Sequence, residues 1–398
     1  MEQSWRWFGP GDVVPLSAIA QAGARGVVTS LHQIPYGEVW SVAAIEQRKG
    51  LLAADPKLGL SWNVVESLPV HERVKLNEGD LSGILDNYRA SMSNLAACGV
   101  KTICYNFMPV IDWTRTELRH PLPNGGTALR FNAHEFAAFD CFMLARKGAE
   151  ADHSPEALRK ARAWFDRASE SERDVLLSSI MAGLPGAFDR YDIPALRRML
   201  ARYADISAEG LRENLARFLK AVIPLAEELG MRFAIHPDDP PRPLMGLPRI
   251  VSNHADLDFI LKAVDAPANG ICLCTGSLGA GATNDPVAIT KAVAPRIHFV
   301  HLRNVAKEPD GSFMEAEHLA GDTDMVAMIE ALLAEQKRRK DEGRADWRMP
   351  MRPDHGHELL DDVGKGSFPG YSAIGRLKGL AELRGVMTAV ARARDLPM

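Results

Sequence analysis

The chain has 398 residues, of which 46% are hydrophobic and 25% charged, and its formal net charge is −4. This composition is that of a soluble globular protein, and its slight acidity disfavours nucleic-acid binding, which needs a basic face. No apolar run approaches the roughly 18 residues of a membrane-spanning helix, and the amino terminus lacks the basic start and apolar stretch of a signal peptide. Five scattered cysteines, an odd number, argue against a disulfide framework and predict a cytoplasmic protein.

Eight short apolar runs alternate with segments of helical periodicity along the chain. The runs cover residues 5–8, 26–31, 60–65, 101–107, 231–236, 270–274, 296–301 and 348–352. Short apolar runs that are separated by helices indicate buried parallel strands. The clearest predicted helices run from about residue 80 to 99, from 207 to 230 and from 322 to 339. Eight strands in this alternation predict an α/β fold of the (β/α)8 barrel type.

The alternation is interrupted once, between residues 112 and 206. Within this stretch, Ser154-Pro155-Glu156 has the N-cap and the first-turn proline of a helix start, and the segment that follows is rich in charge. We therefore expect a single barrel domain over residues 1–398, with a helical insertion at 112–206 after the fourth strand.

Four of the apolar runs end at, or just before, a side chain of a type that binds metals: His236, Cys274, His301 and Asp354. A lone histidine or cysteine at such a position is usually structural, and we expect Cys272 to be inert core. Four such residues at successive strand ends are a different matter, because barrel strands end at one common rim. Together they predict a metal site. Nitrogen, sulfur and oxygen donors suit Zn²⁺, Fe²⁺ or Mn²⁺, whereas Ca²⁺ and Mg²⁺ prefer oxygen cages.

Polar side chains also follow the predicted strands of the first half. We expect His32, Glu66, His71 and Asn106 to contact a hydroxylated ligand at the same rim. Three arginines, Arg115, Arg303 and Arg352, are candidates to bind a substrate carboxylate through paired hydrogen bonds. A structural hydrogen bond or a rim salt bridge explains any single one of them equally well. Phosphate-binding loops and the Gly-x-Ser-x-Gly elbow are missing, which disfavours nucleotide chemistry and serine hydrolysis.

Six motifs along the chain resemble those of the D-mannonate dehydratase family of hexuronate catabolism. They are Trp5-Arg6-Trp7-Phe8-Gly9, Trp62-Asn63-Val64-Val65-Glu66-Ser67-Leu68-Pro69-Val70-His71, Cys104-Tyr105-Asn106-Phe107-Met108-Pro109, His236-Pro237-Asp238-Asp239-Pro240-Pro241, Cys274-Thr275-Gly276-Ser277 and Arg352-Pro353-Asp354-His355-Gly356. The resemblance spans residues 4 to about 390. It implies a barrel related to xylose isomerase that binds one Mn²⁺ or Fe²⁺ ion through His236, Cys274, His301 and Asp354. We further expect a homo-oligomer, a dimer or larger, that acts on a small sugar acid and has neither a nucleic-acid nor a membrane partner.

The reaction that the resemblance implies is the dehydration of D-mannonate to 2-keto-3-deoxygluconate. The proton on C2 is very weakly acidic because its loss puts a second negative charge beside the carboxylate, which a divalent ion stabilises. A base must take this proton, and an acid must protonate the departing C3 hydroxyl. His355 and Tyr371 are candidates for this pair, with their roles unassigned, and Arg303 is a third catalytic candidate. Two other classes stay open: a metal-dependent sugar isomerase or epimerase, and a non-catalytic sugar-acid binding protein.

Overall fold

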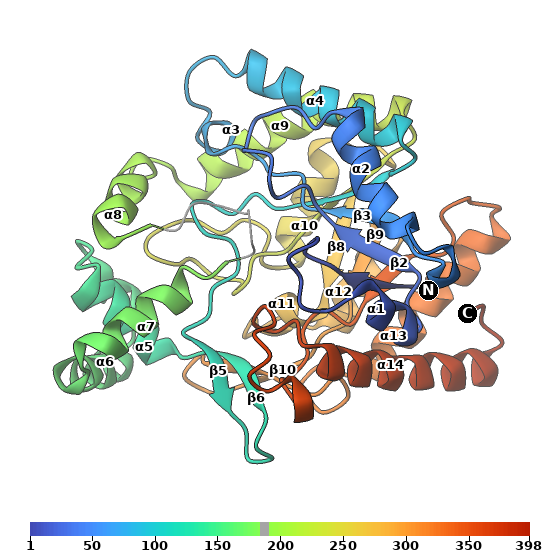
Figure 1. The fold of residues 1–398 in the computed structure, drawn as a ribbon. Coiled ribbons are helices and arrows are strands. Elements are labelled where there is room, and N and C mark those ends of the chain that lie inside the picture. The colour runs from blue at the N-terminus through green and yellow to red at the C-terminus, as the bar shows by residue number, and fades with distance from the viewer. Residues whose placement is uncertain (184–190) are drawn as a thin grey trace.

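Eight parallel strands form a closed barrel at the centre of the computed structural model, which describes residues 1–183 and 191–398 (Figure 1). In their order around the barrel the strands are β1 (Glu2–Arg6), β12 (Pro350–Arg352), β9 (Ile297–His301), β8 (Asn269–Cys274), β7 (Arg232–Ile235), β4 (Thr102–Tyr105), β3 (Ser61–Glu66) and β2 (Gly26–Thr29). Every neighbouring pair is parallel. The predicted (β/α)8 barrel is confirmed.

Both faces of the barrel strands are buried, which explains why the strands read as continuous apolar runs. Alternate side chains of a strand point to opposite faces. The inner faces meet in a cluster of fully buried residues: Val28, Val64, Cys104, Ala234, Cys272 and Phe299. The outer faces, with residues such as Val27, Ile103 and Phe233, belong to the main hydrophobic core beneath the helices. Cys272 is therefore a core residue, as expected.

Helices alternate with the strands and surround the barrel. They are α1 (Leu16–Gln21), α2 (Val42–Ala53), α3 (Glu72–Leu76), α4 (Ser82–Ala97), α9 (Ala208–Glu228), α10 (His254–Ala263), α11 (Thr275–Gly279), α12 (Pro286–Val293), α13 (Met325–Asp341) and α14 (Ala373–Arg394). The three clearest predicted helices correspond to α4, α9 and α13. Side chains cap their starts where the sequence offers them: Ser207 Oγ, for example, accepts a hydrogen bond from Gly210 N of α9. Within residues 1–183 and 191–398, no helix has the length and apolarity needed to span a bilayer.

The first strand begins earlier in the chain than predicted. We expected it at residues 5–8, but β1 covers Glu2–Arg6. Its first two residues, Glu2 and Gln3, pair with β12 at the open end of the barrel and are partly exposed there. Polar side chains are tolerated at this end, so the apolar pattern did not mark the start of the strand.

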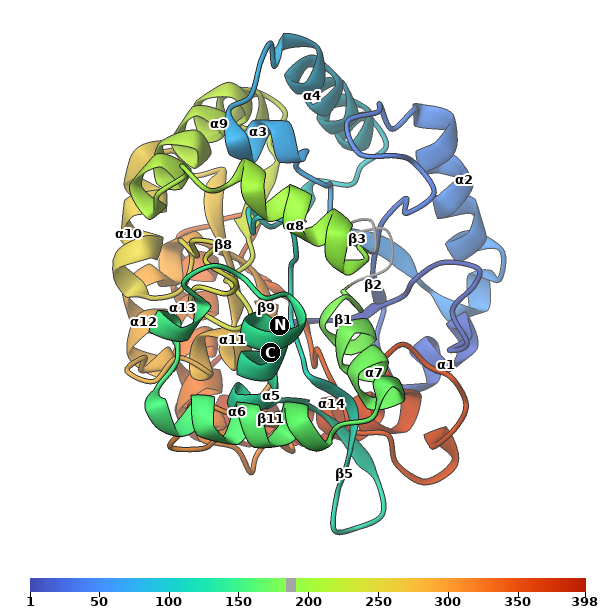
Figure 2. The same ribbon diagram turned by 90° about the vertical axis from the view of Figure 1, so that its left-hand side faces the viewer.

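The segment between β4 and β7 holds the predicted insertion, and its charged stretch is helical as expected. It contains α5 (Ala133–Ala138), α6 (Pro155–Arg167), α7 (Glu170–Ile180) and α8 (Ile193–Arg202), and Ser154 caps α6 as predicted. Figure 2 shows these helices in front of the barrel, on the side where β4 ends. Of the predicted range 112–206, residues 184–190 lie outside the described residues.

A β-hairpin begins this segment and was not predicted. Its strands β5 (Glu117–Pro121) and β6 (Thr127–Phe131) join β10 (Val305–Lys307) and β11 (Phe313–Glu315) in a sheet of order β10-β11-β6-β5. The hairpin thus brings the segment after β4 against the segment after β9. This second sheet places one further carboxylate, that of Glu315, next to the barrel rim.

Candidate active site and metal centre

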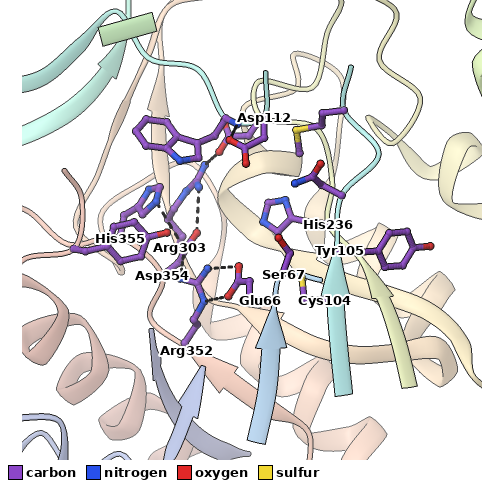
Figure 3. A pocket seen from close by; sticks show the side chains of 15 residues that line it. Glu66, Ser67, Cys104, Tyr105, Asp112, His236, Arg303, Arg352, Asp354 and His355 are labelled. Carbon is purple, nitrogen blue, oxygen red and sulfur yellow. Dashed lines mark hydrogen bonds and ion pairs between the residues drawn. The ribbon is translucent and has the colours of Figure 1, made fainter. Parts of the chain in front are cut away.

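A cavity of about 450 Å³ lies at the ends of several barrel strands (Figure 3). The predicted site residues that line it are Glu66, Asn106, His236, Arg303, Arg352, Asp354, His355 and Tyr371. They come from the ends of β3, β4, β7, β9 and β12 and from the loops that follow, because the carboxyl ends of parallel barrel strands meet at one rim.

The four predicted metal ligands converge on the buried side of this cavity. His236 Nε2 lies 3.1 Å from His301 Nδ1, and Asp354 Oδ2 lies 3.9 Å from the same nitrogen. Cys274 Sγ lies 3.7 Å from Asp354 Oδ2. Atoms that each bind one ion at about 2.0–2.3 Å lie about 3–4 Å from one another. The donor atoms of Cys274, His301 and Asp354 all lie within 4.8 Å of one another, a spacing that suits one ion, and His236 adjoins this group through His301.

Hydrogen bonds outside this donor set orient both imidazoles. His236 Nδ1 lies 2.7 Å from the carbonyl oxygen of Pro237, so Nδ1 carries a proton and the Nε2 lone pair faces the other donors. His301 turns its Nε2 toward Glu66 Oε1 at 3.5 Å, which leaves Nδ1 for the donor set. Metal-binding histidines are commonly held by such outer contacts to a carbonyl or a carboxylate. These contacts turn His236 Nε2 and His301 Nδ1 toward each other.

A second group of candidate donors, His236, Cys272 and His301, overlaps with the first. Cys272 Sγ lies 3.5 Å from His301 Nε2, the nitrogen that also faces Glu66. Cys274 Sγ instead accepts a hydrogen bond of 3.1 Å from Ser277 Oγ. The two groups differ in their cysteine: the first contains Cys274, and the second contains Cys272, whose Sγ lies beside Nε2 of His301.

Two of the predicted arginines line the cavity, and both are bound to carboxylates there. Arg352 donates to the two carboxylate oxygens of Glu66 at 2.7 and 3.0 Å and also contacts Asp354. Arg303 Nη1 donates to Asp354 Oδ2 at 3.1 Å. Burial alone would raise the pKa of Glu66, but the charge of Arg352 outweighs it and holds that pKa at about 2. The carboxylates of this wall are therefore ionised at neutral pH.

Three predicted substrate-binding residues, His32, His71 and Arg115, do not line the cavity. His32 Nε2 lies 3.2 Å from Arg6 Nη2, and burial lowers the pKa of His32 to about 2, so its neutral ring accepts that hydrogen bond. His71 precedes α3, and its Nδ1 accepts a hydrogen bond from Arg73 N. One ring nitrogen of each histidine is thus occupied by a structural contact.

Arg115 is completely buried in a network of ion pairs behind the cavity. It donates to both carboxylate oxygens of Asp239, at 2.7 and 3.1 Å, and to Glu315 Oε1 at 2.9 Å. Asp239 also accepts from Arg303 at 2.9 Å. Burial would raise the pKa of Asp239, but the two arginines hold it far below its usual range. Arg115 thus ties the start of the insertion to the loops after β7 and β9 and does not face a ligand.

Removal of Arg115 is expected to destabilise the protein strongly. In Arg115→Met, the buried carboxylates of Asp239 and Glu315 lose one of their cations, and loss of one partner of a buried ion pair costs about 3–5 kcal/mol of unfolding free energy. Urea denaturation measures this loss. The control is Arg159→Ala, which breaks an exposed pair with Glu156 on α6 of the same insertion and should leave the midpoint nearly unchanged. Equal midpoints for the two variants would contradict the prediction.

His355 and Tyr371 lie side by side at the cavity, with ring centroids 5.0 Å apart and ring planes at 82°. Nδ1 of His355 lies 3.1 Å from Glu315 Oε1, and its Nε2 lies 3.9 Å from Asp354 Oδ1. Tyr371 is buried, and burial raises the pKa of its phenol above the ordinary value. Tyr371 therefore keeps its proton at neutral pH. The pair offers one proton acceptor and one proton donor.

The sequence analysis assigned no role to Asp112, Asp239 or Glu315, which the structure places at or beside the cavity. The position of Asp239 could have indicated a role in the site, since it follows the end of β7 at the same rim as His236. Asp112 stands at the first position of the predicted insertion. No sequence signal marked Glu315, because its position depends on the pairing of β11 with β6.

Comparison with known proteins agrees with the motifs. The family model described as D-mannonate dehydratase (UxuA) matches residues 1–396. This chain belongs to the D-mannonate dehydratase family. The family's reaction is the dehydration of D-mannonate to 2-keto-3-deoxygluconate, which makes the chain a lyase. The resemblance inferred from the sequence is therefore confirmed.

Relatives in this family match over nearly the whole chain. The mannonate dehydratase of Chromohalobacter salexigens is 55% identical over 391 residues, which cover 98% of this chain and 99% of that protein. The crystal structure of the mannonate dehydratase from Streptococcus suis serotype 2 superposes with a TM-score of 0.76 at 33% identity, covering 99% of this chain and 95% of that one. A xylose isomerase domain protein from Alicyclobacillus acidocaldarius, at 14% identity and a TM-score of 0.50, shows the same fold.

Proposed function

We propose that D-mannonate is dehydrated in the cavity described above, with one Mn²⁺ or Fe²⁺ ion held by His236, Cys274, His301 and Asp354. The observation that carries this proposal is the convergence of these four donor atoms beside a cavity in a chain of this family. Nitrogen, sulfur and oxygen donors in one site suit Mn²⁺ or Fe²⁺ and not Ca²⁺ or Mg²⁺. Such an ion, when bound, acts as a Lewis acid toward the substrate carboxylate and the C2 hydroxyl.

His355 and Tyr371 are the proton-transfer pair of this proposal. Because Nδ1 of His355 is bound to Glu315, its Nε2 is the base that takes the C2 proton. Tyr371 keeps its phenolic proton at neutral pH and donates it to the C3 hydroxyl, which leaves as water. The proton gained by His355 and the proton lost by Tyr371 balance, so the pair returns to its first state by one proton transfer.

The other predicted site residues divide by their position. Glu66, Asn106 and Arg352 line the cavity and remain in the proposal as residues that bind or position the substrate. Arg303 keeps a catalytic role in the proposal as the cation at the cavity wall that holds Asp354 in place. The remaining three, His32, His71 and Arg115, are structural residues in this proposal, because they do not line the cavity and make structural contacts elsewhere.

We extend the proposal to the organisation of the chain. It comprises one barrel domain over residues 1–398, with the insertion at 112–206 within it. All five cysteines are free, which supports a reducing compartment such as the cytoplasm. A homo-oligomer, a dimer or larger, is the expected assembly, and analytical ultracentrifugation measures it.

Incubation of the Mn²⁺- or Fe²⁺-loaded protein with D-mannonate tests the function. The expected result is a 2-keto-3-deoxy acid, detected by its carbonyl chemistry, and little product from the C2 epimer D-gluconate. An isomerase or epimerase would instead convert the sugar acid without loss of water, and a binding protein would leave it unchanged. Absence of the keto acid with both metals would overturn the proposed function.

A further inference from the structure

One carboxyl group of the cavity differs from the others in its partners. Glu66, Asp239 and Asp354 are each paired with an arginine. Asp112 also lines the cavity and is 5% exposed, but among the described residues it forms no salt bridge. One of its oxygens accepts a hydrogen bond of 2.5 Å from Trp113 N, and the carboxyl group is drawn beside the cavity in Figure 3. A buried carboxyl without a cation is costly, so its second oxygen is suited to a hydrogen-bond donor from a ligand.

The loop that carries Asp112 is held in place by side chains from three other segments. The bonds run from Lys75 Nζ to Met108 O (2.7 Å), from Val110 N to Glu72 Oε2 (3.3 Å) and from Arg249 Nη2 to Ile111 O (3.0 Å). Val110 has a φ of 62°, a left-handed conformation that is strained for a β-branched residue. Strained backbone persists only where its surroundings enforce it. The loop therefore holds the backbone of Asp112 in place beside the cavity.

Asp112 stands where two cavities adjoin. A second cavity of about 330 Å³ shares Ser67, Asn106, Met108 and Asp112 with the first. The first cavity contains the ligand-type residues His236 and Asp354, and the second does not. Asp112 therefore lies on the path that a six-carbon sugar acid, anchored by its carboxylate at the first cavity, would follow toward the second. Its distal carbons carry hydroxyl groups, which are the donors that a carboxylate accepts.

We propose that Asp112 is a specificity-determining residue that accepts hydrogen bonds from the hydroxyl groups on the distal carbons, C5 and C6, of the sugar acid. This assignment rests on the proposed function of the cavity. It separates Asp112 from the groups at C1 to C3, where bonds are made and broken. Asp112 thus selects substrates by the length of their carbon chain and by their distal hydroxyl groups, whereas the substrate carboxylate binds at the other end of the cavity.

The prediction is a selective loss of affinity for the full-length substrate. Asp112→Asn and Asp112→Ala should lower kcat/KM for D-mannonate by about 10- to 100-fold, the range for a hydrogen bond to a charged group. The loss should fall mainly on KM. The four-carbon aldonate with the same configuration at C2 and C3 lacks C5 and C6, so its inhibition constant should change by less than about threefold, as for a residue that does not contact it.

Metal content and the thermal midpoint of each variant show that the site is intact, and the asparagine variant keeps the shape of the side chain if alanine unfolds the loop. Glu135→Gln is the matched control, because Glu135 is a half-buried carboxyl on α5 that lines neither cavity and has no salt bridge among the described residues. It should change neither constant. Equal losses for D-mannonate and the four-carbon aldonate, or a loss confined to kcat, would overturn the assignment. A wild-type protein that does not dehydrate D-mannonate would instead overturn the proposed function.

Discussion

The Cys274→Ala and His236→Ala proteins are expected to fold but to lose their metal and, with it, their activity. Each change removes one donor from a set whose closest atoms lie 3.1 Å apart and whose members are all buried or half-buried. Groups that only orient a metal ligand cost about 10–100-fold in affinity when mutated, so removal of a ligand should cost more than about 100-fold. Elemental analysis after dialysis measures the metal content, and circular dichroism with thermal unfolding verifies the fold.

Cys272→Ala is the matched control for this experiment. Its thiol lies on the same strand, two residues before Cys274, and belongs to the overlapping group of donors. On the proposed assignment the variant keeps its metal and loses only the stability that a small core cavity costs. If Cys272→Ala lost its metal and Cys274→Ala retained it, the metal site would instead be formed by His236, Cys272 and His301. Full occupancy in both Cys274→Ala and His236→Ala would contradict the proposed centre altogether.

The second large effect concerns proton transfer, since His355→Asn and Tyr371→Phe should bind metal and D-mannonate nearly normally and still turn over about 10²–10⁴-fold more slowly. Tyr371→Phe removes the phenolic oxygen but keeps the ring, which packs edge-on against Phe8 with the ring centroids 4.8 Å apart. His355→Asn keeps a hydrogen-bond donor that is able to face Glu315. Turnover at saturating metal and substrate, measured alongside metal content, tests both residues.

A structural role for either residue would give a different pattern. If His355 only positioned the neighbouring Asp354, its asparagine variant would lose about 10–100-fold in metal affinity, and saturating metal would restore turnover. Tyr105→Phe is the control for the loss of a phenol, because this tyrosine contacts Phe218 and Phe233 and points away from the other side chains of the cavity in Figure 3. Its turnover should stay near that of the wild type. Near-normal turnover of Tyr371→Phe would remove Tyr371 from the mechanism.

The barrel could be predicted because its signals are local. Each strand is buried on both faces, and so appears as a short apolar run between helical segments. The exceptions follow from the same physics. β1 begins with Glu2 and Gln3, which stand at an open end of the barrel where polar residues are tolerated. The second sheet escaped prediction because β6 pairs with β11, almost 200 residues away, and the edge strand β5 contains polar and charged residues on both faces.

The candidate metal ligands could also be predicted from the sequence, because each is a metal-binding residue type at the end of a predicted strand. His236, Cys274, His301 and Asp354 meet because the strands before them end at a common rim, as the barrel topology requires. The arginines carried no comparable signal. Arg115, Arg303 and Arg352 are chemically equivalent in the sequence, yet one is sealed behind the cavity and two line it.

The sequence by itself determined the barrel and the family and predicted four strand-end metal ligands, because periodicity, residue type and motif are properties of short segments. Only the tertiary structure decided which charges meet. Arg115 pairs with Asp239, Glu315 contacts His355, and Asp112 forms no salt bridge among the described residues. Ion pairing falls off steeply with distance and depends on burial, and both are set by the packing of segments far apart in the chain.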